Sequence, residues 1–319
     1  MTGIGVISNA KSTRNEVSMR AVHDVLAEHP EIPHLVFHEI AGLRSGLRDL
    51  AARGISHLVI SGGDGTVQAS INDLLQDRPF AELPWISLIA GGMTNVIARD
   101  VGMTGKPAVA LRRLIERVKN GDPGELQERH VMGLSLDGGQ NTTYGFVGGA
   151  IGFYQGTMLS RQHAHRIGLR QMLAANATIL QSMVRLLIHG PGPRSGFTGE
   201  KVLLGLNGET PRQRDVFMLV LTTLDQLTPG IMPFWGERKR AIKYTLVDHP
   251  PKRFLRAVWP ALRGRGLPWM EAAGYQSGSL DHLRMTLRSP FVMDGELFMP
   301  RNGNTIDITA GPAIPFHRF

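Results

Sequence analysis

The chain has 319 residues, of which 42% are hydrophobic and 19% charged, so it can bury a sizeable core and is long enough for two domains. Its mean hydropathy of -0.08, with no apolar run near the ~18 residues that a membrane helix needs, excludes a transmembrane protein. The absence of cysteine excludes disulfides and Cys-ligated zinc and is compatible with a cytosolic protein, and we expect no secretory signal from its first residues.

The net charge of +8 is unevenly distributed along the chain. Residues 1–124 hold 13 Lys and Arg against 13 Asp and Glu, which leaves 22 basic and 14 acidic residues for 125–319. A basic excess of this kind favours an anionic partner, which could be nucleic acid, a phosphorylated ligand or the cytoplasmic leaflet of a membrane. The alternative is a solvated basic surface with no partner.

Residues 1–124 alternate short β-branched runs with helical periodicity, which is typical of a doubly wound α/β unit with a parallel sheet. We expect strands at 4–8, 35–40, 57–61 and 85–90, and helices at 16–28, 43–53, 66–75, 96–100 and 107–119. Ligands of such sheets bind beyond the carboxyl ends of the strands. The loops after Ser8, Ser61 and Ala90 should therefore share one rim.

A cluster of turn residues, Asn-Gly-Asp-Pro-Gly at 120–124, predicts a domain boundary. Strands are expected after it at 129–136, 143–147, 201–207, 215–222, 241–247, 282–287 and 305–308, and one long helical pattern covers 158–189. We therefore predict a nucleotide-binding α/β domain at 1–124 and a β-rich, β-sandwich-like domain at 125–304 with a helical insertion. The C-terminal segment 305–319 is a candidate to join the first domain.

The most informative stretch is Leu-Val-Ile-Ser-Gly-Gly-Asp-Gly-Thr-Val at 58–67, an apolar strand that runs into a glycine-rich turn and a helix. Successive glycines let backbone N–H groups converge on an anion, and the helix N-terminus adds the positive end of its dipole. The pattern predicts a phosphate site. Within it, Asp64 would orient a nucleotide hydroxyl, a magnesium-bound water or a basic side chain. The alternative is an ordinary strand-to-helix turn.

Here the sequence resembles the catalytic family of the diacylglycerol kinases, which includes sphingosine and ceramide kinases and shares a superfamily with NAD kinases. The Gly-Gly-Asp-Gly-Thr pentapeptide at 62–66 is similar to the superfamily signature, residues 8–12 to an Asn-Pro-x-Ser-Gly loop, and residues 92–99 to Gly-Thr-x-Asn-Asp-Phe-Ala-Arg. The resemblance implies that ATP is held at these loops. The implied nucleotide-binding residues are Asn9, Ser12, Gly62, Gly63, Asp64, Gly65, Thr66, Gly92, Thr94 and Asn95.

Near the C-terminus, Phe-Val-Met-Asp-Gly-Glu at 291–296 resembles the segment that carries the catalytic Asp of the family. Phosphoryl transfer to an alcohol needs the phosphates held, their charge offset by Mg²⁺ and a carboxylate near the attacking hydroxyl. Asp294 is the candidate general base, and Glu296 is a second carboxylate that could orient the metal or the base. The alternative is that Asp294 and Gly295 form only a tight hairpin turn.

Two departures from the family pattern bear on substrate and metal. Val96 follows Asn95 where diacylglycerol kinases commonly have Asp, and Met93 replaces the usual Thr, which weakens a strict diacylglycerol assignment more than lipid kinase activity. Trp-Gly-Glu followed by Arg-Lys-Arg occupies 235–240, where bacterial relatives often have an Asp-Asp-Gly segment tied to a structural magnesium. We therefore assign no metal ligands.

Residues 252–269 interleave Lys and Arg with Trp, Phe and Leu, as suits a membrane interface. The alternative is a core-facing helix with a solvated basic face. Nucleic acid is not expected as a partner, because no recognisable binding module accompanies these residues. His163 and His165 have no paired ligand motif and are expected to be surface residues rather than metal ligands.

Together these features predict an ATP- and Mg²⁺-dependent lipid kinase that phosphorylates a hydroxyl of a diacylglycerol-like or ceramide-like (sphingoid) lipid. We expect a cytoplasmic protein that is peripheral on the inner face of the membrane, with an anionic membrane surface as partner and a homodimer as one assembly. The rival enzyme is an NAD kinase, against which the motifs at 92–99 and 294–296 argue. The rival without activity is a lipid-binding regulator, suggested by Val96 and by residues 235–240.

Overall fold

The computed structural model of the chain describes residues 3–10, 15–92, 95–103, 105–122, 124–164, 192, 196–301 and 305–318. These residues form two compact units, each built from separate stretches of the chain. Unit 1 comprises Met1–Val131, Leu224–Thr228 and Pro312–Phe319, and unit 2 comprises Met132–Thr223 and Pro229–Gly311. The chain therefore passes from one unit to the other within β5 (Glu125–Leu136), at both ends of the short stretch Leu224–Thr228, and within β15 (Thr305–Arg318).

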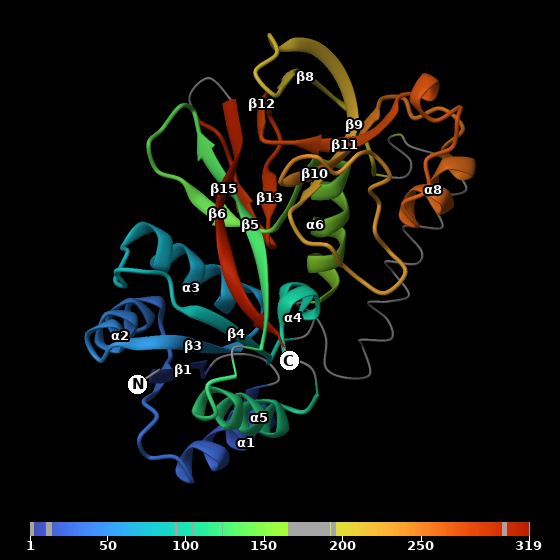
Figure 1. Cartoon of the computed structure of the whole chain (residues 1–319). Helices are drawn as coiled ribbons and strands as arrows, with labels where there is room; N and C mark the ends of the chain where they lie inside the picture. The colour runs from blue at the N-terminus through green and yellow to red at the C-terminus, as the bar shows by residue number, and fades with distance from the viewer. Residues whose placement is uncertain are drawn as a thin grey trace. The chain divides into compact units, whose positions relative to one another are not determined.

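Unit 1 contains a parallel sheet with the strand order β2-β1-β3-β4, followed by the end of β15, where Phe316 pairs with Ile86. Its elements are β1 (Gly3–Asn9), α1 (Asn15–Ala27), β2 (His34–Phe37), α2 (Ile40–Ala52), β3 (Ile55–Gly62), α3 (Asp64–Gln76), β4 (Trp85–Ala90), α4 (Val96–Val101) and α5 (Pro107–Lys119). Helices α1 and α5 cover one face of this sheet, and α2 and α3 cover the other (Figure 1). The predicted doubly wound parallel sheet is confirmed.

The order of the strands in unit 1 creates a topological switch point. The chain goes from β1 outward to β2 in one direction and then to β3 and β4 in the other, so the order reverses between β1 and β3. Connections that leave adjacent strands on opposite faces of the sheet open a crevice at their carboxyl ends. Residues that follow β1 and β3 are therefore the ones that the fold presents to a ligand.

Unit 2 is β-rich, as predicted, and its strands pair mainly in the antiparallel direction. Seven of its strands follow the order β14-β13-β7-β9-β8-β12-β15. In addition, β10 pairs with β9 and with β11, and β5 pairs with β15 and with β6. The bounds are β6 (Thr143–Gly145), β7 (Val147–Ile151), α6 (Gly152–Ala164), β8 (Glu200–Leu206), β9 (Arg212–Thr222), β10 (Ile242–Asp248), α8 (Phe254–Leu262), η1 (Glu271–Ala273), β11 (Tyr275–Leu280), β12 (His282–Thr286), β13 (Phe291–Met293) and β14 (Glu296–Phe298). Inward-facing Leu, Ile, Val, Met and Phe side chains of these strands form its core.

Several predicted boundaries differ from the structure for local reasons. The strand expected at 35–40 ends at Phe37, because Ile40 opens α2 with a largely exposed side chain. The strand expected at 143–147 is divided at Phe146 into β6 and β7. The helical pattern at 158–189 is described only as far as Ala164, and the rest, with His165, lies outside the described residues. No helix within the described part of the chain is long and apolar enough to cross a membrane.

A cluster of three rings at the amino ends of β3 and β4 makes the stability of unit 1 sensitive to acid. The His57 ring lies 5.8 Å from the Trp85 ring and 5.6 Å from the His317 ring. Burial, followed by the charge of His317, lowers the pKa of His57 to about 4 from its ordinary value of 6.5. The His57 ring is therefore protonated at a lower pH in the folded protein than in the unfolded chain.

Acidification between pH 6.5 and pH 4 is expected to destabilise the protein through His57. The pKa of His57 is lower in the folded protein than in the unfolded chain, so the contribution of its neutral ring to the free energy of unfolding is fully present above pH 6.5. This contribution is lost as the pH falls toward 4, and for a partly exposed ring it amounts to roughly 2 kcal/mol. Urea unfolding of the wild type and of His57→Phe across this range measures it. His57→Phe should show a shallower fall, and equal slopes would contradict the assignment.

Candidate functional site

The first two predicted loops meet at the switch point of unit 1. Asn9 ends β1, and its side-chain Nδ2 donates a 3.0 Å hydrogen bond to Oγ1 of Thr66 in the first turn of α3. Gly62 ends β3, and Gly63 is the N-cap of α3, so the helix begins at Asp64, two residues earlier than predicted. The first N–H groups of a helix have no partner within it. The Gly-Gly-Asp-Gly-Thr segment thus places a helix N-terminus at the rim where ligands bind.

Glycine is required where the second and third loops touch. A Cβ on Gly92 would lie 2.6 Å from Cα of Gly63 in the second loop. Within the second loop itself, a Cβ on Gly62 would lie 2.6 Å from Cβ of Thr66. Gly91 N also donates to Gly62 O at 2.8 Å. The loop after β4 is therefore packed directly on the backbone of the loop after β3, and the two form one continuous surface.

The carboxylate of Asp64 fastens the third loop to the second. Its two oxygens each accept a 3.0 Å hydrogen bond, one from the Val96 backbone N–H and one from that of Ile97, at the start of α4. This contact caps α4 from a residue far away in sequence. Sequence reasoning expected Asp64 to orient a nucleotide hydroxyl, a metal-bound water or a basic side chain, and did not anticipate the cap.

Asn95 holds the third loop in its own conformation. It lies in the left-handed region with φ of 48°, its Oδ1 accepts from Gly92 N at 2.8 Å, and its Nδ2 donates to Gly92 O at 2.7 Å. The side chain thus closes a ring with the backbone of Gly92 and shapes the loop at its contact with Gly63.

Of the predicted nucleotide-binding residues, Ser12 and Thr94 lie outside the described part of the chain.

The second set of candidate residues belongs to unit 2. Asp294 and Gly295 connect β13 to β14, and both have positive φ, 47° and 88°. Two such residues form the type I′ turn of a tight hairpin, so the structural alternative considered from sequence describes their backbone correctly. Glu296 begins β14, where it pairs with Met293 and is exposed.

The carboxylate of Asp294 is nevertheless held in a defined position. Its oxygens accept hydrogen bonds from the backbone N–H groups of Phe146 at 2.9 Å and Val147 at 2.8 Å. Asp294 N donates to Val147 O at 2.8 Å. A Cβ on Gly145 would lie 2.7 Å from Oδ2 of Asp294, so glycine is needed there for the carboxylate to approach. The break between β6 and β7 at Phe146 is what turns both N–H groups toward Asp294.

Sequence reasoning missed a buried polar network behind this carboxylate. Phe146 O accepts from Oγ1 of Thr222 and from Thr223 N, each at 3.0 Å. Lys243, only 6% exposed on β10, donates from Nζ to Thr223 O at 3.3 Å. A buried cation is costly unless hydrogen-bonded, so a lysine inside an apolar strand was the available signal. The network supports the backbone that binds Asp294.

The segment at 235–240 does not fit a structural magnesium. Trp235 N and Gly236 N donate to Oγ of Ser277, and Lys239 N and Arg240 N donate to Oγ of Ser279. An ion pair of 2.7 Å joins Arg240 to Asp281. Among the described residues, no three His, Asp or Glu side chains are grouped as they would be around a metal ion. Serine hydroxyls and an arginine ion pair thus hold this segment in place. A hard cation such as Mg²⁺ would instead need carboxylate and carbonyl oxygens as ligands.

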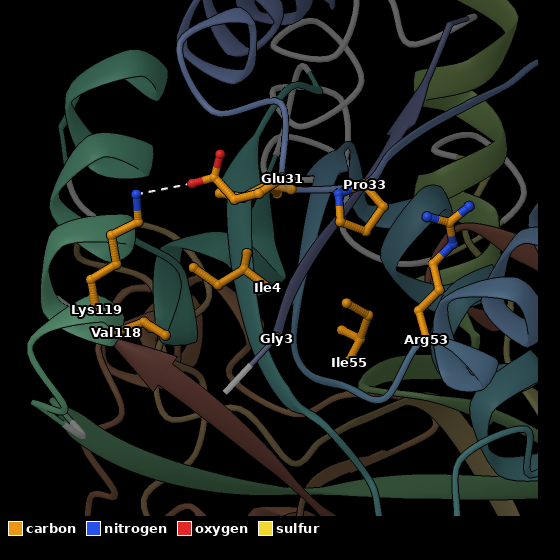
Figure 2. A pocket seen from close by; sticks show the side chains of 9 residues that line it. Gly3, Ile4, Glu31, Pro33, Arg53, Ile55, Val118 and Lys119 are labelled. Carbon is orange, nitrogen blue, oxygen red and sulfur yellow. Dashed lines mark hydrogen bonds and ion pairs between the residues drawn. The ribbon is translucent and has the colours of Figure 1, made fainter. Parts of the chain in front are cut away.

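A separate hollow of about 510 Å³ lies at the opposite end of the sheet of unit 1. Its lining includes the starts of β1 and β3 and the segment before β2, which are the amino ends of these strands, and an ion pair of 3.0 Å joins Lys119 to Glu31 at its edge (Figure 2). It contains none of the predicted site residues. Ligands of doubly wound sheets bind at the carboxyl ends, so this hollow is not the nucleotide site.

Comparisons with known proteins agree with the motifs. Residues 4–125 match the diacylglycerol kinase catalytic domain, which confirms the resemblance over the region that holds the three loops. A "Probable lipid kinase YegS-like" protein of Xanthomonas campestris is 27% identical over 285 residues, 86% of this chain and 87% of the relative. A protein of the same description from Xanthomonas euvesicatoria is 26% identical over the same share. The domain match and these relatives show that the chain is similar to lipid kinases and indicate that it is a kinase.

Solved structures show the same fold at much lower sequence identity. A diacylglycerol kinase from Bacillus anthracis is similar with a TM-score of 0.61 at 14% identity, covering 98% of this chain and 96% of that one. A second structure from that organism has a TM-score of 0.67 at 13% identity, covering 99% and 97%. The likeness extends over both units, so the β-rich unit belongs to this fold as well.

Proposed function

We propose that the chain is an ATP- and Mg²⁺-dependent lipid kinase that phosphorylates a hydroxyl of a diacylglycerol-like or ceramide-like lipid. The observation that carries the proposal is the joining of three loops at the carboxyl ends of β1, β3 and β4, within the region that matches a kinase catalytic domain. A helix N-terminus and glycine backbone form a surface suited to phosphates.

In this proposal each loop has a distinct task. Backbone N–H groups from Gly63 to Gly65 bind phosphate oxygens, while Asn9 and Asp64 hold the neighbouring loops in register around them. Mg²⁺, when bound, offsets phosphate charge, and it needs only one or two protein carboxylates because it keeps several waters. Asp64 is the carboxylate that the loop offers. Oxygens of a carboxylate accept more than one bond each, so the cap on α4 leaves acceptor capacity.

Asp294 is the proposed general base. As the lipid hydroxyl attacks the γ-phosphorus, a new P–O bond forms, the bond to the bridging oxygen of ADP breaks, and the hydroxyl proton passes to Oδ of Asp294. The amides of Phe146 and Val147 fix that carboxylate before the substrate arrives. Fixing a reacting group in advance lowers the entropy lost in reaching the transition state.

The proposed setting is the cytoplasmic face of a membrane, where a lipid acceptor resides. The basic excess after residue 124 would favour anionic headgroups there. A homodimer stays a prediction that a measurement of mass in solution would test. The two rivals, an NAD kinase and an inactive lipid-binding regulator, make different predictions for activity.

The function is tested by incubating the purified chain with γ-labelled ATP, Mg²⁺ and a panel of acceptors. The panel contains diacylglycerol, ceramide, sphingosine, monoacylglycerol and NAD, each in mixed micelles or buffer as its solubility requires. Label in a lipid product supports the lipid kinase, and label in NAD alone supports the rival enzyme. Vesicle binding without transfer to any acceptor supports the regulator.

Gly92→Ala is expected to lower ATP affinity about tenfold or more, because the added methyl group would press on the Gly63 backbone and separate two phosphate-facing loops. Calorimetric titration with a non-hydrolysable ATP analogue measures the effect. The matched control is Gly42→Ala in α2, where the nearest atom to the new methyl group lies 3.6 Å away. Equal affinity of wild type and Gly92→Ala would remove the third loop from the nucleotide site.

A further inference from the structure

Helix α8 of unit 2 exposes two large apolar side chains on one face. Leu255 is 60% and Trp259 62% exposed, and residues four apart on a helix lie side by side. Leu267, in the turn that follows, is also exposed at 36%. Two such side chains turned toward solvent on one helix face are unfavourable unless something covers them.

The helix itself is firmly attached, so this exposure is not the result of loose packing. Ala257 is fully buried in a cluster with Phe217, Val247, Met270 and Tyr275, against which Phe254 and Ala261 also pack. Tyr275 Oη donates to Lys252 O at 2.9 Å, just before the helix. The inner face of α8 therefore packs on unit 2 and fixes the direction in which the outer face points.

Cations surround the exposed apolar side chains. Residues 249–270 contain five Lys and Arg and no Asp or Glu, and all five basic side chains are exposed. The guanidinium of Arg263 lies 4.4 Å from the centre of the Trp259 ring, and that of Arg253 lies 5.5 Å from the Trp269 ring. These cation–π contacts keep the cations beside the indole rings.

We propose that the outer face of α8 docks on an anionic phospholipid surface, with Leu255 and Trp259 inserted at the headgroup level and the flanking arginines on lipid phosphates. Trp is enriched at this level of a bilayer because one part of the indole is apolar and its N–H is polar. The inference rests on the proposed function, since a kinase with a membrane lipid as acceptor must reach the bilayer surface.

The charge of the face selects this occupant over a second copy of the chain. If two copies met through α8, their two segments 249–270 would bring ten exposed cations together and no carboxylate. These like charges would repel one another. Anionic phospholipid headgroups supply the missing negative charge. Their attraction to each Lys or Arg near the surface contributes about 1 kcal/mol to the binding free energy, which corresponds to about a fivefold change in binding. Apolar insertion adds to it, and salt should weaken the electrostatic part alone.

The test is co-sedimentation of the full chain with vesicles of phosphatidylcholine containing 30% phosphatidylglycerol, and with vesicles of pure phosphatidylcholine. Leu255→Ser with Trp259→Ser should lower partitioning about tenfold or more, and Arg256→Gln with Arg263→Gln about 25-fold at low salt. The matched control is Leu203→Ser, an equally apolar side chain 45% exposed on β8, which should change binding less than twofold.

A second readout locates the insertion. Lipids brominated on their acyl chains should quench tryptophan fluorescence of the wild type, and Trp259→Phe should abolish most of that quenching. Binding to anionic vesicles that is equal in all variants, or absent from the wild type, would overturn the proposal. So would variants that alter self-association in sedimentation equilibrium while leaving vesicle binding unchanged, because a second copy would then cover the face.

Failure of this inference can be distinguished from failure of the proposed function. A short-chain diacylglycerol dissolved below its aggregation threshold needs no bilayer, and the α8 variants should phosphorylate it as the wild type does. Transfer to this soluble acceptor without vesicle binding would reject the docking face and keep the kinase. Vesicle binding through α8 without transfer to any acceptor would reject the kinase and keep the docking face.

Discussion

Replacing Asp294 by Asn should lower kcat by roughly two to four orders of magnitude with little change in ATP affinity, because the amide does not accept the proton of the attacking hydroxyl. The measurement is the steady-state rate with the lipid acceptor identified in the panel, at saturating ATP. Glu296→Gln is the matched control. Glu296 is exposed one residue past the hairpin turn, so we expect its loss to have the smaller effect.

The structure adds a second consequence of Asp294→Asn that the experiment must separate. Asp294 accepts bonds from two backbone N–H groups, and an Asn side chain has only one oxygen. Its NH₂ group would face the N–H of Phe146 or Val147, which leaves a donor unpaired at a cost of about 1–3 kcal/mol. Thermal unfolding therefore accompanies the kinetics, and turnover is compared at a temperature where every variant is folded.

The two effects have different signatures. Loss of the base lowers kcat and leaves KM for the lipid nearly unchanged, whereas a displaced hairpin would raise KM for the lipid. A variant that mainly raises KM for ATP would move Asp294 to nucleotide binding. If Glu296→Gln alone loses kcat, the base is Glu296.

The part of the site that could be predicted from sequence is the part determined by local chemistry. An apolar strand followed by Gly62 and Gly63 and then by a helical pattern predicts a strand-to-helix turn, and its place at a sheet rim follows from the alternation of strands and helices. The Asp294–Gly295 pair likewise predicts a hairpin turn by itself. The hairpin turn is confirmed and also holds the Asp294 carboxylate on the amides of Phe146 and Val147, so it is compatible with the catalytic role, which stays a prediction.

What sequence could not supply is the pairing of distant residues. Nothing near Asp64 in the sequence indicates that its oxygens bind the amides of Val96 and Ile97. Lys243 in the same way appears only as a charged residue within a strand, and its partner Thr223 is known only once β9 and β10 are paired. Turn chemistry and periodicity are local, whereas these contacts depend on which strands become neighbours.

Asp64→Ala is expected to lower turnover by three orders of magnitude or more, because it removes the carboxylate that we propose for Mg²⁺ and releases the third loop at the same time. Loss of the two bonds to α4 should cost about 1–2 kcal/mol, comparable to the loss of an N-cap, and should lower the melting temperature by only a few degrees. The matched control is Asp77→Ala, which removes ion pairs with Arg44 and Arg48 at the other end of α3 and should keep full activity. Raising Mg²⁺ separates the two roles of Asp64: partial rescue of turnover indicates lost metal binding, and no rescue indicates that the displaced loop accounts for the defect. Near-normal turnover in a folded Asp64→Ala protein would remove this loop from the active site.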